Sequence, residues 1–178
     1  LLITILSLQP LTLFAAPTAQ EEDTTIYVDA ESYTGMQDKS VELIGKVKVI
    51  RGLEMLTCDR ATVDMVKQEV TGIGNVTFIS PTNYVRSERF IYNFKTKTGI
   101  IFNGFLQTGQ ETIEGEEIIK NEDGSYTGRY ASYTSCTNCP AGWKVSGSKI
   151  NATKGSYAFI TNPIIKIYGI PILWLPYI

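Results

Sequence analysis

The sequence predicts an all-β fold with antiparallel strands, in the form of either a sandwich or a jelly roll. Three observations indicate this class. Apolar and polar residues alternate with a period of two, glycine, asparagine, aspartate and proline interrupt at short intervals, and no long segment keeps a helical period. Alternation with period two is typical of a strand that has one buried and one solvated face. The segments are also rich in Val, Ile, Thr, Tyr and Phe, which favour strands.

The N-terminal segment resembles the end of an export signal. Residues 1–16 are an apolar run that is broken by Pro10 and ends in Ala15 and Ala16. The run is shorter than the roughly 20 residues that cross a bilayer, and its small residues suit a signal-peptidase site. We expect residues 1–19 to be a partial signal peptide and residues 20–25 an acidic linker. A buried N-terminal strand or helix is the alternative.

The body of the chain carries the alternating pattern in several separate segments. Gly45 and Gly74 each precede such a segment, so we expect a turn at each glycine. The alternating apolar positions are Ile26 and Val28, then Val47 and Val49, then Val76 and Phe78, and then Phe90, Tyr92 and Phe94.

A weak internal repeat relates these segments. The segment 45–50 aligns with 74–79 at an offset of 29 residues, and 58–64 aligns with 87–93 at the same offset. A fainter third copy falls at 116–118. Repeats of this length indicate stacked supersecondary units, here of two strands each. One such unit cannot bury its apolar face alone, so neighbouring units are expected to share a long apolar trough.

Composition excludes several classes of function. The chain has 178 residues and no histidine, which removes the commonest general base and metal ligand. The formal charge of −2 provides no basic surface for nucleic acid. We therefore expect no catalytic residue, no metal site, no cofactor and no nucleic-acid partner.

The last third of the chain carries the most specific motifs. Tyr133-Thr134-Ser135-Cys136 is followed by Trp143, and the chain ends in a segment from Gly169-Ile170-Pro171 to Leu175-Pro176-Tyr177. These motifs resemble the N-terminal domain of the LPS-assembly protein D family, also called organic solvent tolerance proteins. The repeats resemble the OstA-like units of that family and of the periplasmic bridge proteins. The resemblance covers residues 26–178.

The resemblance implies a fold and a function. It implies a two-sheet β-jelly roll over residues 26–168, open along one side like a groove, and a connector over 169–178 to an outer-membrane barrel that this sequence lacks. The domain would receive lipopolysaccharide acyl chains at the periplasmic face of the outer membrane and pass them to the barrel. Its partners would be lipopolysaccharide, a periplasmic bridge protein joined edge to edge by strand addition, and an outer-membrane lipoprotein plug inside the barrel. It would not be an enzyme.

Two sets of residues are candidates for contact with the lipid. Asp59-Arg60 and Glu88-Arg89 recur in the repeat, as head-group contacts at the groove mouth or as ordinary surface ion pairs. The alternating apolar residues of the repeat either line the lipid path or form an ordinary core. These lipid-groove candidates are Val47, Val49, Ala61, Val63, Val76, Phe78, Phe90 and Tyr92.

The three cysteines receive different interpretations. Cys136 matches a cysteine that in the resembled family forms a disulfide to the barrel. Cys139 departs from the simplest family pattern, and a local bridge between Cys136 and Cys139 would close a small strained ring. Both residues are disulfide candidates. Cys58 is interpreted as a small packing residue.

Two alternatives to the assembly-protein domain remain open from the sequence. One is a stand-alone periplasmic lipopolysaccharide bridge with the same repeats. The other is a jelly-roll glycan-binding or hydrolytic domain, although no carboxylate pair stands out for hydrolysis.

The prolines of the last segment, Pro163, Pro171 and Pro176, exclude central strand positions there. There Trp174 and Tyr177 suit a membrane interface or ordinary packing.

Overall fold

The computed structural model describes residues 25–36, 39–136, 141–153 and 157–176. All regular structure in these residues is β, with antiparallel pairing, so the predicted all-β class is confirmed. The strands are β1 (Tyr27–Asp29), β2 (Ser32–Met36), β3 (Ser40–Arg51), β4 (Glu54–Asp64), β5 (Glu69–Ile79), β6 (Asn83–Asn93), β7 (Thr98–Thr108), β8 (Glu111–Lys120), β9 (Tyr126–Thr134), β10 (Trp143–Ala152), β11 (Ala158–Thr161), β12 (Ile164–Ile167) and β13 (Ile170–Trp174).

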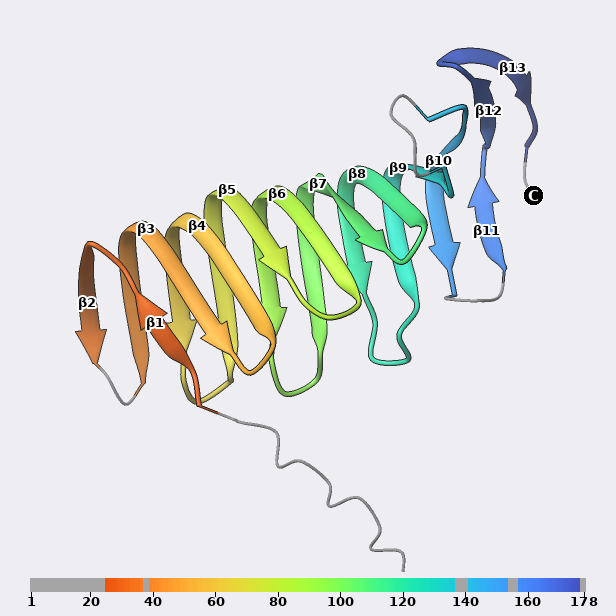
Figure 1. Cartoon of the computed structure of the whole chain (residues 1–178). Helices are drawn as coiled ribbons and strands as arrows, with labels where there is room; N and C mark the ends of the chain where they lie inside the picture. The colour runs from red at the N-terminus through yellow and green to blue at the C-terminus, as the bar shows by residue number, and fades with distance from the viewer. Residues whose placement is uncertain (1–24, 37–38, 137–140, 154–156, 177–178) are drawn as a thin grey trace, which may run out of the picture.

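The strands from β3 to β10 follow one another as a meander. Each pairs with the next along the chain, so the described strands form one continuous sheet (Figure 1). The repeat of 29 residues corresponds to one hairpin of this meander, and β3–β4 is followed by β5–β6 in the same register. The repeat therefore reflects the stacking of hairpins that the sequence predicts.

A bend divides the long strands into two halves. The register shifts between Ile44 and Val47 in β3 and between Ile73 and Val76 in β5. At the first of these shifts φ is +82° for Gly45 and +46° for Lys46. A residue with positive φ inside a strand produces a bulge that turns the chain while the ladder continues on both sides.

The two glycines predicted to form turns therefore lie inside strands, and that expectation was wrong. Gly45 belongs to β3 and Gly74 to β5, where φ is +76°. Glycine permits the same left-handed backbone in a turn and in a bulge, so the local sequence does not distinguish the two.

The bends fold the sheet onto itself in two arms. The first arm comprises 47–58, 76–87 and 104–115, and the second arm comprises 60–73, 89–102 and 117–129. Ring centroids show that the arms face each other, because Phe78 of the first arm lies 5.0 Å from Phe90 and 4.8 Å from Tyr92 of the second. The two layers that the sequence analysis expected as two sheets are the two arms of one folded sheet.

The two arms acquire separate edge strands at both ends of the trough. At one end β1 pairs with the first-arm half of β3 and β2 pairs with its other half. At the other end β12 pairs with 143–146 of β10 and β11 pairs with 149–152. The arms diverge beyond β10 (Figure 1). One buried core runs between the arms from Val41 to Ile160.

Candidate functional site

The inner surface of the folded sheet brings together all eight groove candidates. Each is at most 3% exposed. Four come from each arm, because the alternation that runs along the strands directs them to the same interior. The first arm contributes Val47, Val49, Val76 and Phe78, and the second contributes Ala61, Val63, Phe90 and Tyr92. Their role in lipid contact stays a prediction.

Aromatic side chains fill the middle of this trough. Phe90 and Tyr92 are stacked with their centroids 5.6 Å apart, and Tyr92 meets Phe94 edge-on at 5.3 Å. A cavity of about 20 Å³ remains beside Phe78, Phe90 and Tyr92. Such a space holds about one water molecule. The middle of the trough is therefore filled by its own side chains in this structure.

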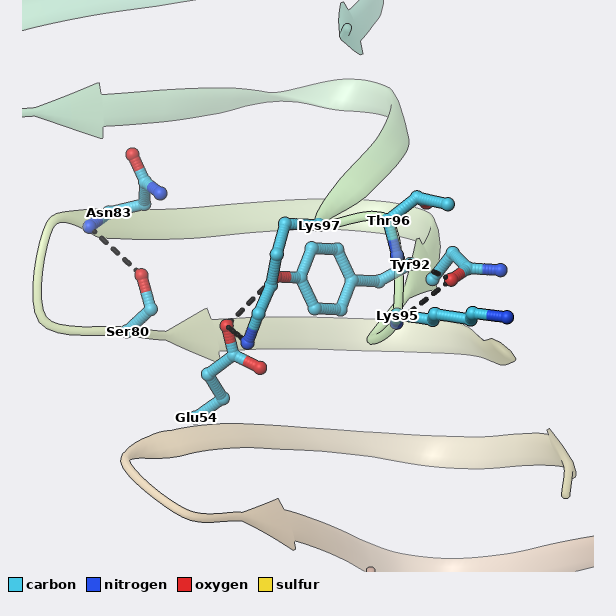
Figure 2. A network of polar contacts seen from close by, with 8 residues as sticks. Glu54, Ser80, Asn83, Tyr92, Lys95, Thr96 and Lys97 are labelled. Atoms are coloured by element: carbon cyan, nitrogen blue, oxygen red, sulfur yellow. Dashed lines mark hydrogen bonds and ion pairs between the residues drawn. The ribbon is translucent and has the colours of Figure 1, made fainter. Parts of the chain in front are cut away.

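The mouth of the trough lies where the turns of one arm meet those of the other. Glu54 follows the β3–β4 turn, whereas Tyr92 lies near the end of β6 and Lys97 lies in the β6–β7 turn. The Tyr92 hydroxyl donates to Glu54 Oε1 at 2.8 Å, and Lys97 Nζ lies 3.1 Å from the same oxygen (Figure 2). Burial, and then the nearby Glu54 carboxylate, raise the pKa of Tyr92. The phenol consequently stays neutral and acts as a donor.

Two further contacts cross the mouth. The Tyr126 hydroxyl donates to Asn83 Oδ1 at 3.1 Å, and burial raises the pKa of Tyr126. The Arg51 guanidinium lies 5.5 Å from the centre of the Phe94 ring, which favours a cation–π contact. Arg51 and Asn83 belong to the first arm, and their partners belong to the second. We call the group Arg51, Glu54, Tyr92 and Lys97 the mouth clasp.

Sequence reasoning missed the mouth clasp. A single carboxylate after a turn usually faces solvent. The one available signal is the alternation of inward and outward side chains along β4. Glu54 lies two residues before Leu56 and four residues before Cys58, which both face inward, so Glu54 is expected on the same side. The partners of Glu54 lie in another hairpin, and no local pattern identifies them.

The recurring acid-arginine pairs lie at the bend, on the outer surface. Asp59 accepts a hydrogen bond from Asn75 Nδ2 and Glu88 accepts one from Asn103 Nδ2, both at 2.8 Å. The two donors have positive φ and sit at the bends of the next strands. The acidic side chains therefore hold the bend. They are exposed and do not lie at the mouth, which disfavours the head-group alternative there. Their exposed position agrees with the surface alternative, although the carboxylates bind asparagines and not the neighbouring arginines.

A hollow on the outside of the sheet is lined by residues of β7 to β10 and of the C-terminal strands. It measures about 730 Å³ and its floor includes Gly104, Gly115 and Gly147. Its carboxylate Glu114 is paired with Lys144 Nζ at 2.8 Å. Within the described ranges no three His, Cys, Asp or Glu residues are grouped to hold a metal ion.

Cys58 and Cys136 have opposite environments. Cys58 is buried, its thiol donates to the Arg60 carbonyl at 3.1 Å, and burial raises its pKa to about 11. These observations agree with a packing role. Cys136 follows β9, and hydrogen bonding from the Trp143 backbone lowers its pKa. Neither thiol is in a disulfide within the described residues, and Cys139 lies outside them, so the proposed pairing stays a prediction.

The C-terminal hairpin of β12 and β13 extends beyond the folded part of the sheet (Figure 1). Pro171 lies on β13, at the end of the strand order among described residues, beside a register shift between Ile165 and Lys166. This placement agrees with the exclusion of proline from central strands. Trp174 is exposed, and Tyr177 lies outside the described residues.

The proposed signal segment 1–19 lies outside the described residues, and so does the linker 20–25 except for Thr25. A search of the described residues finds no helix that is long and apolar enough to cross a membrane.

Comparison with known proteins adds independent findings. A sequence profile described as "LptA/(LptD N-terminal domain) LPS transport protein" matches residues 27–126. The LPS-assembly protein LptD of Aliivibrio fischeri is 22% identical over 162 residues, which cover 89% of this chain and 21% of that protein. The LptD of Nitrosomonas europaea is 24% identical over 162 residues, covering 89% and 22% respectively. The chain thus spans about a fifth of the length of these relatives.

A solved structure supports the fold. It is that of LptH, described as the LptA homologous periplasmic component of the conserved lipopolysaccharide transport device of Pseudomonas aeruginosa. The TM-score is 0.51 at 18% identity, and the match covers 58% of this chain and 80% of LptH. At this identity the likeness establishes a shared architecture alone.

Proposed function

The chain belongs to the LptA/(LptD N-terminal domain) family of LPS transport proteins, and on this premise we propose that it is the periplasmic domain of an outer-membrane lipopolysaccharide transport and assembly protein. The domain receives the acyl chains of lipopolysaccharide in the trough and passes them onward. The curated relatives that match 89% of the chain are LPS-assembly proteins, which favours this function over that of a stand-alone bridge.

The observation that carries the proposal is the continuous apolar interior between two arms of one sheet. Inward residues from both arms form a single core along the stacked hairpins. Transfer of an acyl chain from water to this apolar surface is favourable by about 0.8 kcal/mol of free energy for each buried CH₂. The sugar and phosphate head of the lipid stays in water at the mouth, so the domain needs no reactive side chain for transport.

The geometry of the sheet also suits repeated opening. Hydrogen-bond ladders run along each arm, whereas the contacts between the arms are side-chain contacts. Separating the arms therefore leaves the backbone ladders intact. The trough can accept a chain without local unfolding.

The remaining parts of the proposal concern partners and location. Edge strands such as β1 and β2 present backbone groups to which another strand can add, and we assign this contact to a periplasmic bridge protein. Residues 169–178 serve as the connector to an outer-membrane barrel, and Cys136 and Cys139 are available for disulfides to that barrel. The domain lies at the periplasmic face of the outer membrane after export, and a lipoprotein plug contacts the barrel.

Photo-crosslinking in cells tests the proposed function. A photoreactive amino acid at Phe78 or Phe90 faces the trough, whereas one at Lys48 or Thr62 faces solvent from the same sheet. We expect lipopolysaccharide adducts from the two inner positions only, detected with an antibody against lipopolysaccharide. Adducts confined to the outer positions would refute the proposal.

A further inference from the structure

Two buried polar atoms at the mouth find no hydrogen-bond partner among the described residues. They are Arg51 Nη1 and Glu54 Oε2. Glu54 as a whole is 9% exposed. Buried polar groups are nearly always paired, so each unpaired one calls for an explanation. An unpaired N–H of a buried guanidinium is best satisfied by an anionic acceptor.

The mouth clasp divides between the two arms. Arg51 and Glu54 belong to the first arm, and Tyr92 and Lys97 belong to the second or to its adjoining turn. Glu54 Oε1 accepts from both of its partners on the opposite arm. The Glu54 carboxylate is therefore one of the contacts that hold the arms together at the mouth, and it must leave Lys97 before the mouth can open there.

The clasp is also placed where the head of a trough-bound amphiphile must lie. Tyr92 contributes to the aromatic interior as well as to the clasp, so the polar mouth is directly continuous with the apolar trough. The Lys97 side chain is 44% exposed and reaches solvent. A ligand whose chains occupy the trough thus presents its head to Lys97 and Arg51.

From these contacts we propose that Arg51 and Lys97 form a binding site for a phosphate group on the head of the transported lipid, and that Glu54 occupies this site while the trough is closed. The inference rests on the proposed function and specifies its ligand site. The phosphate takes the place of the Glu54 carboxylate on Lys97 and pairs with the unsatisfied Arg51 N–H. Loss of the Glu54–Lys97 pair then removes one of the contacts that hold the arms together at the mouth.

The test uses two probes that differ in phosphate alone. One is a diphosphorylated, acylated disaccharide of the kind that anchors lipopolysaccharide, and the other is the same glycolipid after dephosphorylation. Purified protein carries a photoreactive residue at Phe78, and the adduct yield is measured against probe concentration. Unfolding midpoints of all variants establish that they are folded.

Lys97→Gln is the decisive variant, with Lys46→Gln as its matched control. Lys46 is paired with Glu31 on the outer surface at 2.9 Å, so its loss removes an equal charge away from the mouth. We expect Lys97→Gln to weaken binding of the phosphorylated probe about tenfold, because one charge-assisted contact is lost. Binding of the dephosphorylated probe should not weaken, because it has no phosphate for Lys97 to bind. Lys97→Arg should restore binding. Stronger binding of both probes by Lys97→Gln would mean that the clasp is a gate without a phosphate site, which would overturn the inference.

Glu54→Gln tests the role of the resident carboxylate, with Glu88→Gln as the control. Glu88 accepts a single hydrogen bond from Asn103 on the outer surface. We expect Glu54→Gln to raise affinity for the phosphorylated probe about fivefold, because the competing anion is gone. Equal affinities in Glu54→Gln and wild type would contradict the exchange. If wild-type protein captures neither probe, the proposed function itself fails, whereas capture of both probes with no effect of Lys97→Gln refutes the phosphate site alone.

Discussion

The trough and the C-terminal hairpin are built from similarly apolar strands, yet only the trough buries them. Val63 on β4 and Ile118 on β8 are fully buried. On β13, Ile172 is 57% and Trp174 is 62% exposed. Apolar content alone therefore does not determine burial in this chain.

Strand length and the bend account for the difference. The strands from β3 to β9 have between 9 and 12 residues, and bends in the middle divide them into halves that face each other. Residues with positive φ mark the bend in β7 and β9 as well, at Asn103 and Tyr130. β12 and β13 have 4 and 5 residues. At about 3.3 Å per residue, such short strands cannot fold back to provide a second layer. The apolar face of the β12–β13 hairpin therefore stays exposed, whereas Ile160 on the equally short β11 is buried in the core.

The largest expected effect compares Phe78→Ala in the trough with Trp174→Ala in the hairpin. Phe78 is packed against Phe90 and Tyr92, so its truncation leaves a cavity and is expected to lower the free energy of unfolding by about 3–5 kcal/mol. The exposed Trp174 is expected to change it by less than about 0.5 kcal/mol. Urea denaturation followed by circular dichroism measures both. Comparable losses in the two variants would show that the hairpin is packed as tightly as the trough.

A smaller loss of stability is expected from adding a methyl group at the bend, and this loss can be compared with that of the same change in an ordinary turn. At Gly104, in the middle of β7, an added Cβ would meet the Arg86 carbonyl oxygen and the Ser87 side chain. Gly104→Ala is therefore expected to cost about 3 kcal/mol through overpacking against the adjacent strand. At Gly109, in the β7–β8 turn, φ is +62° and nothing lies within 4 Å of an added Cβ. Gly109→Ala is expected to cost about 1 kcal/mol of backbone strain.

Thermal and urea unfolding of the two glycine variants provide the measurement. The difference between the two losses in the free energy of unfolding is more informative than either loss alone, because both substitutions add the same methyl group. Equal costs would mean that the bend relaxes as easily as an exposed turn, which would contradict the close packing of Gly104 against β6.

The smallest expected effect is a difference in reactivity between the thiols of Cys58 and Cys136, which can be measured without altering the fold. With a pKa of about 11, Cys58 is a thiolate in only about one molecule in a thousand at pH 8, and its burial restricts access. The pKa of Cys136 is lowered, so more of it is thiolate at the same pH. We expect iodoacetamide to modify Cys136 well before Cys58 in reduced, native protein.

Peptide mapping by mass spectrometry at successive times follows this reaction. Raising the pH toward 11 should narrow the difference, because the thiolate fraction of Cys58 keeps rising up to that pH, whereas Cys136, whose pKa is lower, reaches its full thiolate fraction earlier. Early modification of Cys58 at pH 8 would show that the trough opens frequently without ligand.

Much of the fold could be predicted from the sequence because the pattern is local. Val47, Val49, Phe78 and Phe90 were assigned to an inner surface from alternation alone, and they are buried there. Gly45 was misassigned to a turn, since positive φ serves a bulge and a turn equally well. The outward position of Asp59 and Arg60 follows from the same bulge, where two consecutive residues of β4 face solvent.

The sequence by itself determined the class of fold, the repeating hairpin and the residues that face inward, because side-chain alternation and glycine freedom act over a few residues. Only the tertiary structure decided which turns meet across the mouth. Glu54 is 38 residues from Tyr92 and pairs with Lys97 in a different hairpin. That pairing depends on how far each strand bends and how the stacked hairpins twist, and these quantities accumulate over the whole sheet.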